Sequence, residues 1–311
     1  GKVPRLSCAA AGNTVETPVM MRRAILVPLY LFVFATGASG LIYQVAWQKY
    51  LSRLLGSDSI ATAVILATFL GGLSLGYLLC GRLTTRVSNH FKVYAALEGA
   101  IGAWGLVFPT LFGLVGAATR GWSFAPPVLI VLQGMLCSSL LLALPTLCMG
   151  GTIPFLTRGV SSNVTEATRV HATVYAVNTA GAFLGTLAAG FFLVPALGLP
   201  LTVMGAAILN LLAALFFYLL SVSMKKPSPV AGAETVRDAP VEAVQPSLFP
   251  AWSLAAVAFL SGFYVMTLEN VLIRITNLSL GSSSYTFTMI VSVFVLAIAV
   301  GSFIVFRMNA L

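Results

Sequence analysis

The residues most able to do chemistry in this sequence are Glu98 and Glu269, two carboxylates that lie inside long apolar stretches. A charged side chain inside a membrane span is costly, so it normally faces protein or water and has a partner. Glu98 lies near a basic loop that carries Arg82, Arg86 and Lys92. A structural ion pair with this loop, or a side chain that extends toward it, is the favoured interpretation of Glu98.

Glu269 is followed by Arg274 near the other end of its own apolar stretch. A structural ion pair with Arg274, or with Lys49 from the first part of the chain, is the favoured interpretation. The alternative is that Glu269 binds a cation, and a polyamine-like ligand would suit it.

Three uncharged polar residues complete the set of candidate ligand-binding residues. Asn178 lies in the middle of an apolar stretch, and Tyr175 lies about one helical turn before it. A buried Asn that bridges helices is one interpretation, and contact with a substrate or cofactor is the other. The candidate ligand-binding residues are Gln44, Glu98, Tyr175, Asn178 and Glu269.

The remaining reactive residue types do not form a common catalytic or metal centre. His90 and His171 are the two histidines, and the four cysteines form no CxxC pair. A metal or haem site needs more ligands than these, at closer spacing. The sequence therefore predicts no catalytic residue, no metal ion and no cofactor.

The composition predicts a membrane protein. Hydrophobic residues make up 59% of the 311 residues and charged residues only 8%, whereas a soluble domain is about a quarter charged. Most of the surface must therefore face lipid. The net charge of +9 comes from scattered basic residues between apolar stretches, a pattern that suits membrane topology better than nucleic-acid binding. We expect an all-α integral membrane protein that contacts the lipid bilayer and no nucleic acid.

The apolar stretches predict eight helices, because a helix needs roughly 20 apolar residues to cross a bilayer. Pro145 and Pro154 fall inside one long stretch, so that helix is expected to kink or to end early. The stretches run over 25–47, 59–81, 93–118, 128–156, 170–197, 200–222, 251–273 and 283–306.

One break in composition divides the chain. Residues 223–250 hold five prolines and balanced charges, which predicts a flexible cytoplasmic linker. The expected domains are a polar N-terminal segment 1–24, a six-helix membrane bundle 25–222, the linker 223–250 and a helical hairpin 251–311.

The basic residues predict the orientation. With the N-terminus inside, thirteen of the 17 Lys and Arg fall in cytoplasmic segments, and only Lys49, Arg53, Arg120 and Arg274 fall outside. Positive charge gathers on the cytoplasmic side of membrane proteins. We therefore expect both termini in the cytoplasm and the protein in a bacterial inner membrane.

Several glycines have the spacing of helix contacts. Gly72 and Gly76 form one GxxxG pair, and Gly181 and Gly185 form another. Two helix backbones can approach closely where there is no Cβ atom. Gly301, late in the last stretch, is expected to mark a similar contact. Packing is the favoured role of these glycines, and a hinge or sliding surface for alternating access is the alternative.

The last two apolar stretches resemble the first two. Six helices separate the copies, so both copies should point the same way, as in the parallel repeats of major facilitator transporters. We expect a six-helix major facilitator-like bundle followed by the two-helix start of a second parallel repeat, with Gly56 and Gly281 at the same membrane face. A shift of 225 residues places Gln44 on Glu269, Lys49 on Arg274, Leu55-Gly56-Ser57 on Leu280-Gly281-Ser282, and Gly76 on Gly301.

Three motifs carry a resemblance to a known family. They are Ser39-Gly-Leu-Ile-Tyr-Gln-Val-Ala-Trp47, Pro145-Thr-Leu-Cys-Met-Gly-Gly-Thr-Ile-Pro154 and Tyr175-Ala-Val-Asn-Thr-Ala-Gly-Ala-Phe-Leu-Gly185. Together they resemble the membrane domain of spermidine synthase-like proteins, in which a major facilitator-like region is fused to a spermidine synthase. The resemblance covers most of residues 30–310. The sequence departs from the family after Tyr43, where a Glu is usual and Gln44 is present.

The resemblance implies a cytoplasmic domain that moves an aminopropyl group from decarboxylated S-adenosylmethionine to putrescine. This sequence has no soluble stretch long enough for a Rossmann-like fold. We therefore expect that the chain is not an enzyme, with aminopropyltransferase activity only if a soluble domain is missing from it.

Three functions are compatible with these observations. The leading one is a non-catalytic membrane domain of a spermidine synthase-like protein, acting as an anchor or a partner-binding subunit. The second is a transporter of a small cationic solute. The third is an accessory structural subunit of a larger pigment or electron-transfer complex. In each case a protein partner is expected on the hairpin 251–306, because its apolar faces exceed what its own chain can cover.

Overall fold

A computed structural model describes residues 19–120, 126–161, 164–223, 250–281 and 284–308. These residues are almost entirely helical, and no strand occurs among them, which confirms the prediction of an all-α fold. Most of the expected N-terminal segment 1–24 and almost all of the expected linker 223–250 lie outside the described residues. The α-helices are α1 (Val19–Leu55), α2 (Asp58–Leu83), α3 (His90–Arg120), α4 (Pro127–Val160), α5 (Val164–Ala188), α6 (Val194–Ser223), α7 (Ala251–Leu280) and α8 (Ser284–Met308).

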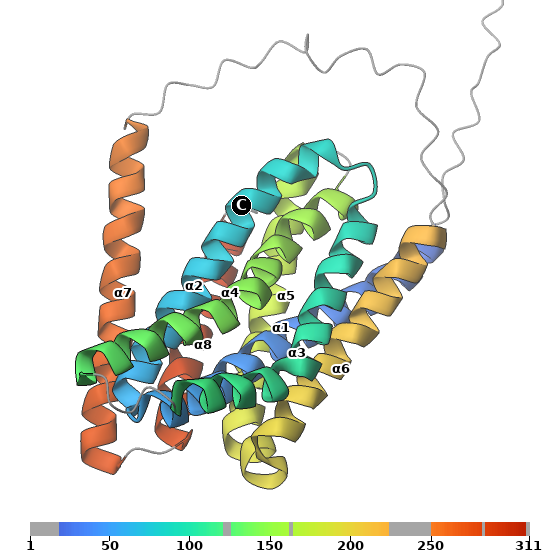
Figure 1. Cartoon of the computed structure of the whole chain (residues 1–311). Helices are drawn as coiled ribbons and strands as arrows, with labels where there is room; N and C mark the ends of the chain where they lie inside the picture. Colours follow the sequence, from blue (N-terminus) through green and yellow to red (C-terminus); the bar gives the residue numbers. More distant parts are fainter. Residues whose placement is uncertain (1–18, 121–125, 162–163, 224–249, 282–283, 309–311) are drawn as a thin grey trace, which may run out of the picture.

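Length and composition would allow seven helical stretches among the described residues to cross a membrane. The longest, Ala167–Ser223, has 57 residues and covers α5, a short π-helix and α6. It contains Gly198, whose φ of 75° and ψ of 171° are not helical. The chain reverses at this break, which lies at the lower end of the bundle in Figure 1. The break therefore lies between the expected helices 170–197 and 200–222.

Prolines do not end α4. Pro145 and Pro154 both lie inside the helix, which continues to Val160. The expectation of an early end is therefore wrong, because the lost backbone hydrogen bonds can be compensated locally where neighbouring helices pack.

The two hairpins α1–α2 and α7–α8 turn in the same way. Gly56 has a φ of 65° and Gly281 a φ of 87°, a conformation that ends helices and that glycine adopts without strain. After Gly56, the side chain of Ser57 accepts a hydrogen bond from the backbone N–H of Ile60 and caps α2. In Figure 1, α1 and α7 both descend toward a turn at the lower end, α1 obliquely across the bundle and α7 upright beside it.

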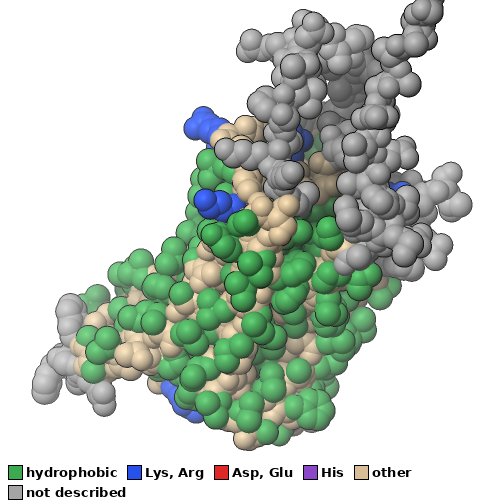
Figure 2. All heavy atoms as spheres, turned by 90° about the vertical axis from the view of Figure 1, so that its right-hand side faces the viewer, with side chains coloured by type: hydrophobic (Ala, Val, Ile, Leu, Met, Phe, Trp, Pro, Cys, Tyr) green, Lys and Arg blue, Asp and Glu red, His purple; other side chains and the backbone are tan. Residues whose placement is uncertain are grey.

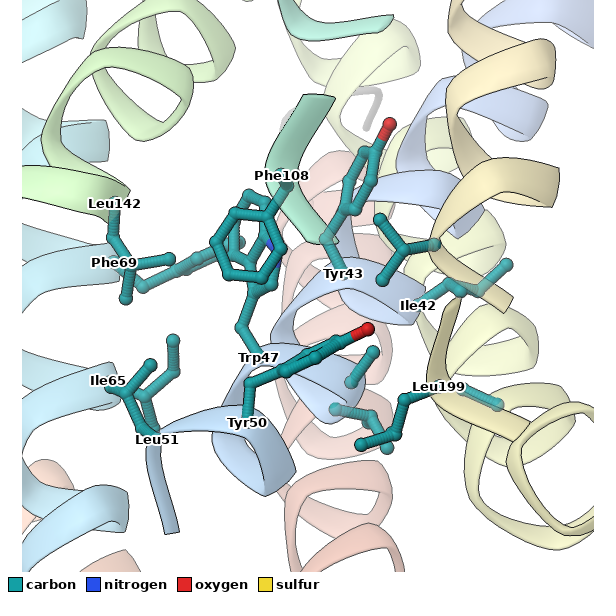
Figure 3. Close-up of a cluster of buried hydrophobic side chains, with 14 of the residues drawn as sticks. Ile42, Tyr43, Trp47, Tyr50, Leu51, Ile65, Phe69, Phe108, Leu142 and Leu199 are labelled. Carbon is teal, nitrogen blue, oxygen red and sulfur yellow. The ribbon is translucent and has the colours of Figure 1, made fainter. Parts of the chain in front are cut away.

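The core lies between α1, α2 and α3. Tyr43, Trp47 and Phe108 are fully buried, and Trp47 stacks on Tyr43 with ring centroids 4.9 Å apart. Figure 3 shows these rings together with Tyr50. The hairpin contributes to the same cluster through side chains such as Phe287. By contrast, Figure 2 shows hydrophobic side chains over most of the visible outer surface and Lys and Arg near its ends.

Four of the expected packing glycines lie at helix crossings. A Cβ atom on Gly72 would meet the side chain of Thr146, and one on Gly76 would meet the backbone of Leu147, both on α4. Gly181 and Gly185 on α5 approach the backbone of α1 in the same way, at Phe34 and Ala38. These four contacts bring the backbones of α2 and α4, and of α1 and α5, into direct contact.

Gly301 does not mark such a contact. No described atom outside its own helix lies within 4 Å of a Cβ atom built there. The physical reason is the position of α7, whose upper half stands apart from the bundle in Figure 1. Trp252 and Phe259 on that half are 74% and 71% exposed. The expected contact at Gly301 is therefore absent from the described part of the chain.

Candidate functional site

The candidate site is a cavity of about 690 Å³ between the helices. Side chains from all eight α-helices line it. Residues far apart in sequence therefore meet around one space, and its volume is in the range of small-molecule sites. All five candidate ligand-binding residues line this cavity: Gln44, Glu98, Tyr175, Asn178 and Glu269.

Glu98 forms the α3 side of the cavity. Its side chain is 1% exposed, and its Oε2 atom accepts a hydrogen bond of 2.6 Å from Nδ2 of Asn210 on α6. Tyr94, one turn earlier on α3, also hydrogen-bonds to Glu98. The expected ion pair with the basic loop is absent from the described residues, since Arg82 and Lys92 are exposed at helix ends while Glu98 faces the interior. That interpretation of Glu98 is corrected.

Glu269 forms the α7 side of the cavity and is 4% exposed. Lys49, one of its two expected partners, instead lies 3.6 Å from a carboxylate oxygen of Asp58. Arg274, the other expected partner, is exposed and makes no ion pair with Glu269 in the described part of the chain. The structural ion pair is therefore corrected, and Glu269 is a buried carboxylate that borders an open cavity.

Helices α1 and α5 form a polar wall. Gln44 on α1 is 4% exposed, and Asn178 on α5 lies where its backbone carbonyl would meet a Cβ atom on Gly37. This close approach, which only glycine permits, positions Asn178 beside α1. Tyr175 lies one turn earlier on the same helix and also lines the cavity.

Asn210 and His171 are among the other residues that line the cavity, and the sequence analysis did not select them as ligand-binding residues. Asn210 is 1% exposed, and it could have been found as a carboxamide inside an apolar stretch. His171 stacks on Tyr175 with ring centroids 6.4 Å apart and meets the edge of Tyr77 at 6.2 Å. No simple sequence signal placed His171 in the cavity, because the contacts come from separate helices.

The charged residues that line the cavity in the described part of the chain are both acidic. Glu98 and Glu269 line it, and no Lys or Arg is among the described residues that do so. The lining also contains apolar side chains such as Leu41, Leu70 and Phe294. Such a cavity favours a ligand with positive charge and an aliphatic body, and it disfavours anions.

The chain is similar over much of its length to curated enzymes. It is 32% identical over 219 residues to a protein of Mycobacterium tuberculosis named polyamine aminopropyltransferase, a match that covers 67% of this chain and 38% of the relative. The protein of the same name from Corynebacterium efficiens is 29% identical over 207 residues, which cover 65% of this chain and 37% of that relative. The chain is homologous to polyamine aminopropyltransferases. It spans less than two fifths of their length.

Two further comparisons gave no result: no family model matches the chain, and no solved structure matches it. The named relatives nevertheless correct one expectation. We expected the chain not to be an enzyme, and this is contradicted by homologues that carry the name of an enzyme. Three motifs indicated homology to spermidine synthase-like proteins, and the names of these relatives confirm the homology.

Proposed function

We propose that this chain provides the membrane-embedded helical part of a polyamine aminopropyltransferase. The observation that carries the proposal is the 32% identity over 219 residues to the Mycobacterium tuberculosis protein of that name. Seven helical stretches of sufficient length and apolarity support the membrane part of the proposal. The helices would anchor the protein in a bacterial inner membrane, and the whole protein would transfer an aminopropyl group to a diamine such as putrescine.

The arrangement of the helices is part of the proposal. We propose a major facilitator-like plan in which α1–α2 and α7–α8 are equivalent hairpins of two parallel repeats. The positive φ angles of Gly56 and Gly281 support it, as does the downward course of both α1 and α7 in Figure 1.

The first test measures membrane retention together with enzyme activity. The native protein should remain in the membrane fraction after a wash with alkaline carbonate and should be released by detergent. Deletion of its gene should lower the rate at which the membrane fraction converts putrescine to spermidine. Reintroduction of the gene should restore this rate. Release by carbonate contradicts the membrane role, and unchanged membrane-bound conversion contradicts the enzymatic one.

The second test concerns orientation. We expect Ser59 at the start of α2 to face the outside and Ser88 before α3 to face the cytoplasm, because both serines are exposed and lie at opposite ends of α2. In a background without the four natural cysteines, a membrane-impermeant maleimide should label Ser59→Cys in intact cells and Ser88→Cys only after lysis. The reverse pattern contradicts the orientation with both termini in the cytoplasm.

A transporter of a small cationic solute is the second candidate function. The cavity favours it, because two carboxylates line it and all eight α-helices contribute to it. Uptake of labelled spermidine into vesicles that contain the purified chain, without any aminopropyl donor, distinguishes transport from anchoring.

We retain the partner protein on the hairpin 251–306 as a proposal, including a role as accessory subunit of a larger complex. The exposed apolar side chains of α7, such as Trp252, Phe259 and Phe263, support it. These side chains would face either a partner or lipid in the membrane.

A further inference from the structure

We propose that the cavity binds a linear organic dication, with one ammonium group at Glu98 and the other at Glu269. The inference goes beyond the proposed function, because it assigns a ligand site inside the helices and does not depend on where aminopropyl transfer takes place. It rests on the position of both acids at one cavity, on the absence of Lys and Arg from the described residues that line it, and on its apolar lining.

Both carboxylates are buried, and neither has a positive partner among the described residues. Glu98 is 1% and Glu269 is 4% exposed, and the ion pair found among the described residues joins Lys49 to Asp58 instead. Asn210 and Tyr94 are neutral and cannot balance the charge of Glu98. Glu269 has no hydrogen-bond partner among the described residues. The charged form of a carboxylate in such surroundings is costly, so the group is either protonated or paired with a cation.

The two acids come from separate parts of the chain. Glu98 belongs to α3 in the six-helix group, whereas Glu269 belongs to α7 in the later hairpin. Both border the same cavity of about 690 Å³. A single ligand that carries two positive charges could therefore pair with both acids.

The apolar side chains of the lining favour a ligand with an aliphatic chain. Leu41, Leu70 and Phe294 provide apolar contacts, which suit methylene groups. Tyr175 presents an aromatic ring to the cavity, and a ring face attracts an ammonium group. A divalent metal ion is a poorer match, because it prefers several oxygen ligands around one point, and no group of three His, Cys, Asp or Glu occurs among the described residues.

Binding of α,ω-diamines to the purified full chain tests the proposal. The probes are unbranched diamines from three to eight carbons, putrescine included, and the monoamine of each length. We expect one diamine length to bind best, at least about 10-fold more tightly than its monoamine, because truncation of one buried ion pair costs roughly 10- to 100-fold in affinity or more.

The variant Glu269→Gln should remove this preference. It keeps the shape of the side chain but loses the charge, so the best diamine should bind no more tightly than the matching monoamine. Glu98→Gln should weaken binding similarly, and its amide oxygen can still accept the hydrogen bond from Asn210. The matched control is Asp58→Asn, which also removes one acid but lies outside the cavity. It should bind diamines as the wild type does.

Three results would overturn the proposal. The first is that no diamine in the series binds to the wild type. The second is that diamine and monoamine bind equally well. The third is that Glu269→Gln binds the best diamine with unchanged affinity while retaining the wild-type melting temperature. None of these results bears on membrane retention or aminopropyl transfer, so failure here is distinguishable from failure of the proposed function.

Discussion

Replacing Gly76 with alanine should destabilise the protein, whereas the same replacement at Gly71 should be neutral or stabilising. Both glycines lie in the middle of α2, only five residues apart. A Cβ atom on Gly76 would overlap the backbone carbonyl of Leu147 on α4, while one on Gly71 would meet no atom within 4 Å. The two substitutions therefore add the same atom in opposite environments.

The expected changes in stability at Gly76 and Gly71 follow from two known effects. Backbone atoms cannot rotate away from a new methyl group as a side chain can, so overpacking at Gly76 should cost about 1–3 kcal/mol or more. Alanine is favoured over glycine within a helix by about 1 kcal/mol, and nothing opposes that gain at Gly71. Gly150 on α4 provides a reciprocal test, because its Cβ atom would overlap the backbone of Leu73 on α2.

Thermal unfolding of the three single variants in one detergent measures this difference. We expect lower melting temperatures for Gly76→Ala and Gly150→Ala, and an unchanged or higher one for Gly71→Ala. If Gly76→Ala and Gly71→Ala shift the melting temperature in the same direction and by the same amount, the close contact of α2 with α4 is wrong.

Local features of the fold were predictable from the sequence. Long apolar stretches with few charges predict helices, and each of the eight coincides with a helical segment. Gly56, Gly198 and Gly281 mark chain reversals because each has a positive φ angle. Such signals act within a few residues, so no knowledge of packing is needed to interpret them.

The partners of the buried acids were not predictable in the same way. Asn210 is 112 positions from Glu98 along the chain, yet it provides the hydrogen bond. The basic residues Arg82 and Lys92 are close to Glu98 in sequence but remain exposed. Closeness in sequence is a poor predictor of interaction partners, because the direction of a side chain around the helix axis decides which neighbour it contacts.

The expectation for Gly301 came from the proposed internal repeat. Gly76 contacts Leu147 of α4, and a sequence match to Gly76 suggested an equivalent contact for Gly301. In the described part of the chain, no helix packs on Gly301 as α4 packs on Gly76. A repeated sequence pattern therefore predicts the local conformation of the helix. A close contact also requires a neighbouring helix that packs on the glycine.

Replacing Trp47 with alanine should also lower the free energy of unfolding strongly. Trp47 is fully buried, and its ring packs on Tyr43 at 4.9 Å and on Phe108 at 5.4 Å between centroids. Removing a buried aromatic ring leaves a cavity and costs roughly 3–5 kcal/mol. In the proposed membrane location, dispersion contacts would dominate this loss, because lipid is as apolar as the side chains.

Two other substitutions make this prediction specific. Trp252→Ala removes a ring that is 74% exposed, so the free energy of unfolding should change by less than about 0.5 kcal/mol. Trp47→Phe keeps an aromatic ring in the core, and the indole Nε1 of Trp47 has no hydrogen-bond partner among the described residues. This variant should therefore lose less than about 1.5 kcal/mol. Equilibrium unfolding in mixed micelles gives all three values, and equal losses for Trp47→Ala and Trp252→Ala would contradict the position of Trp47 in the core.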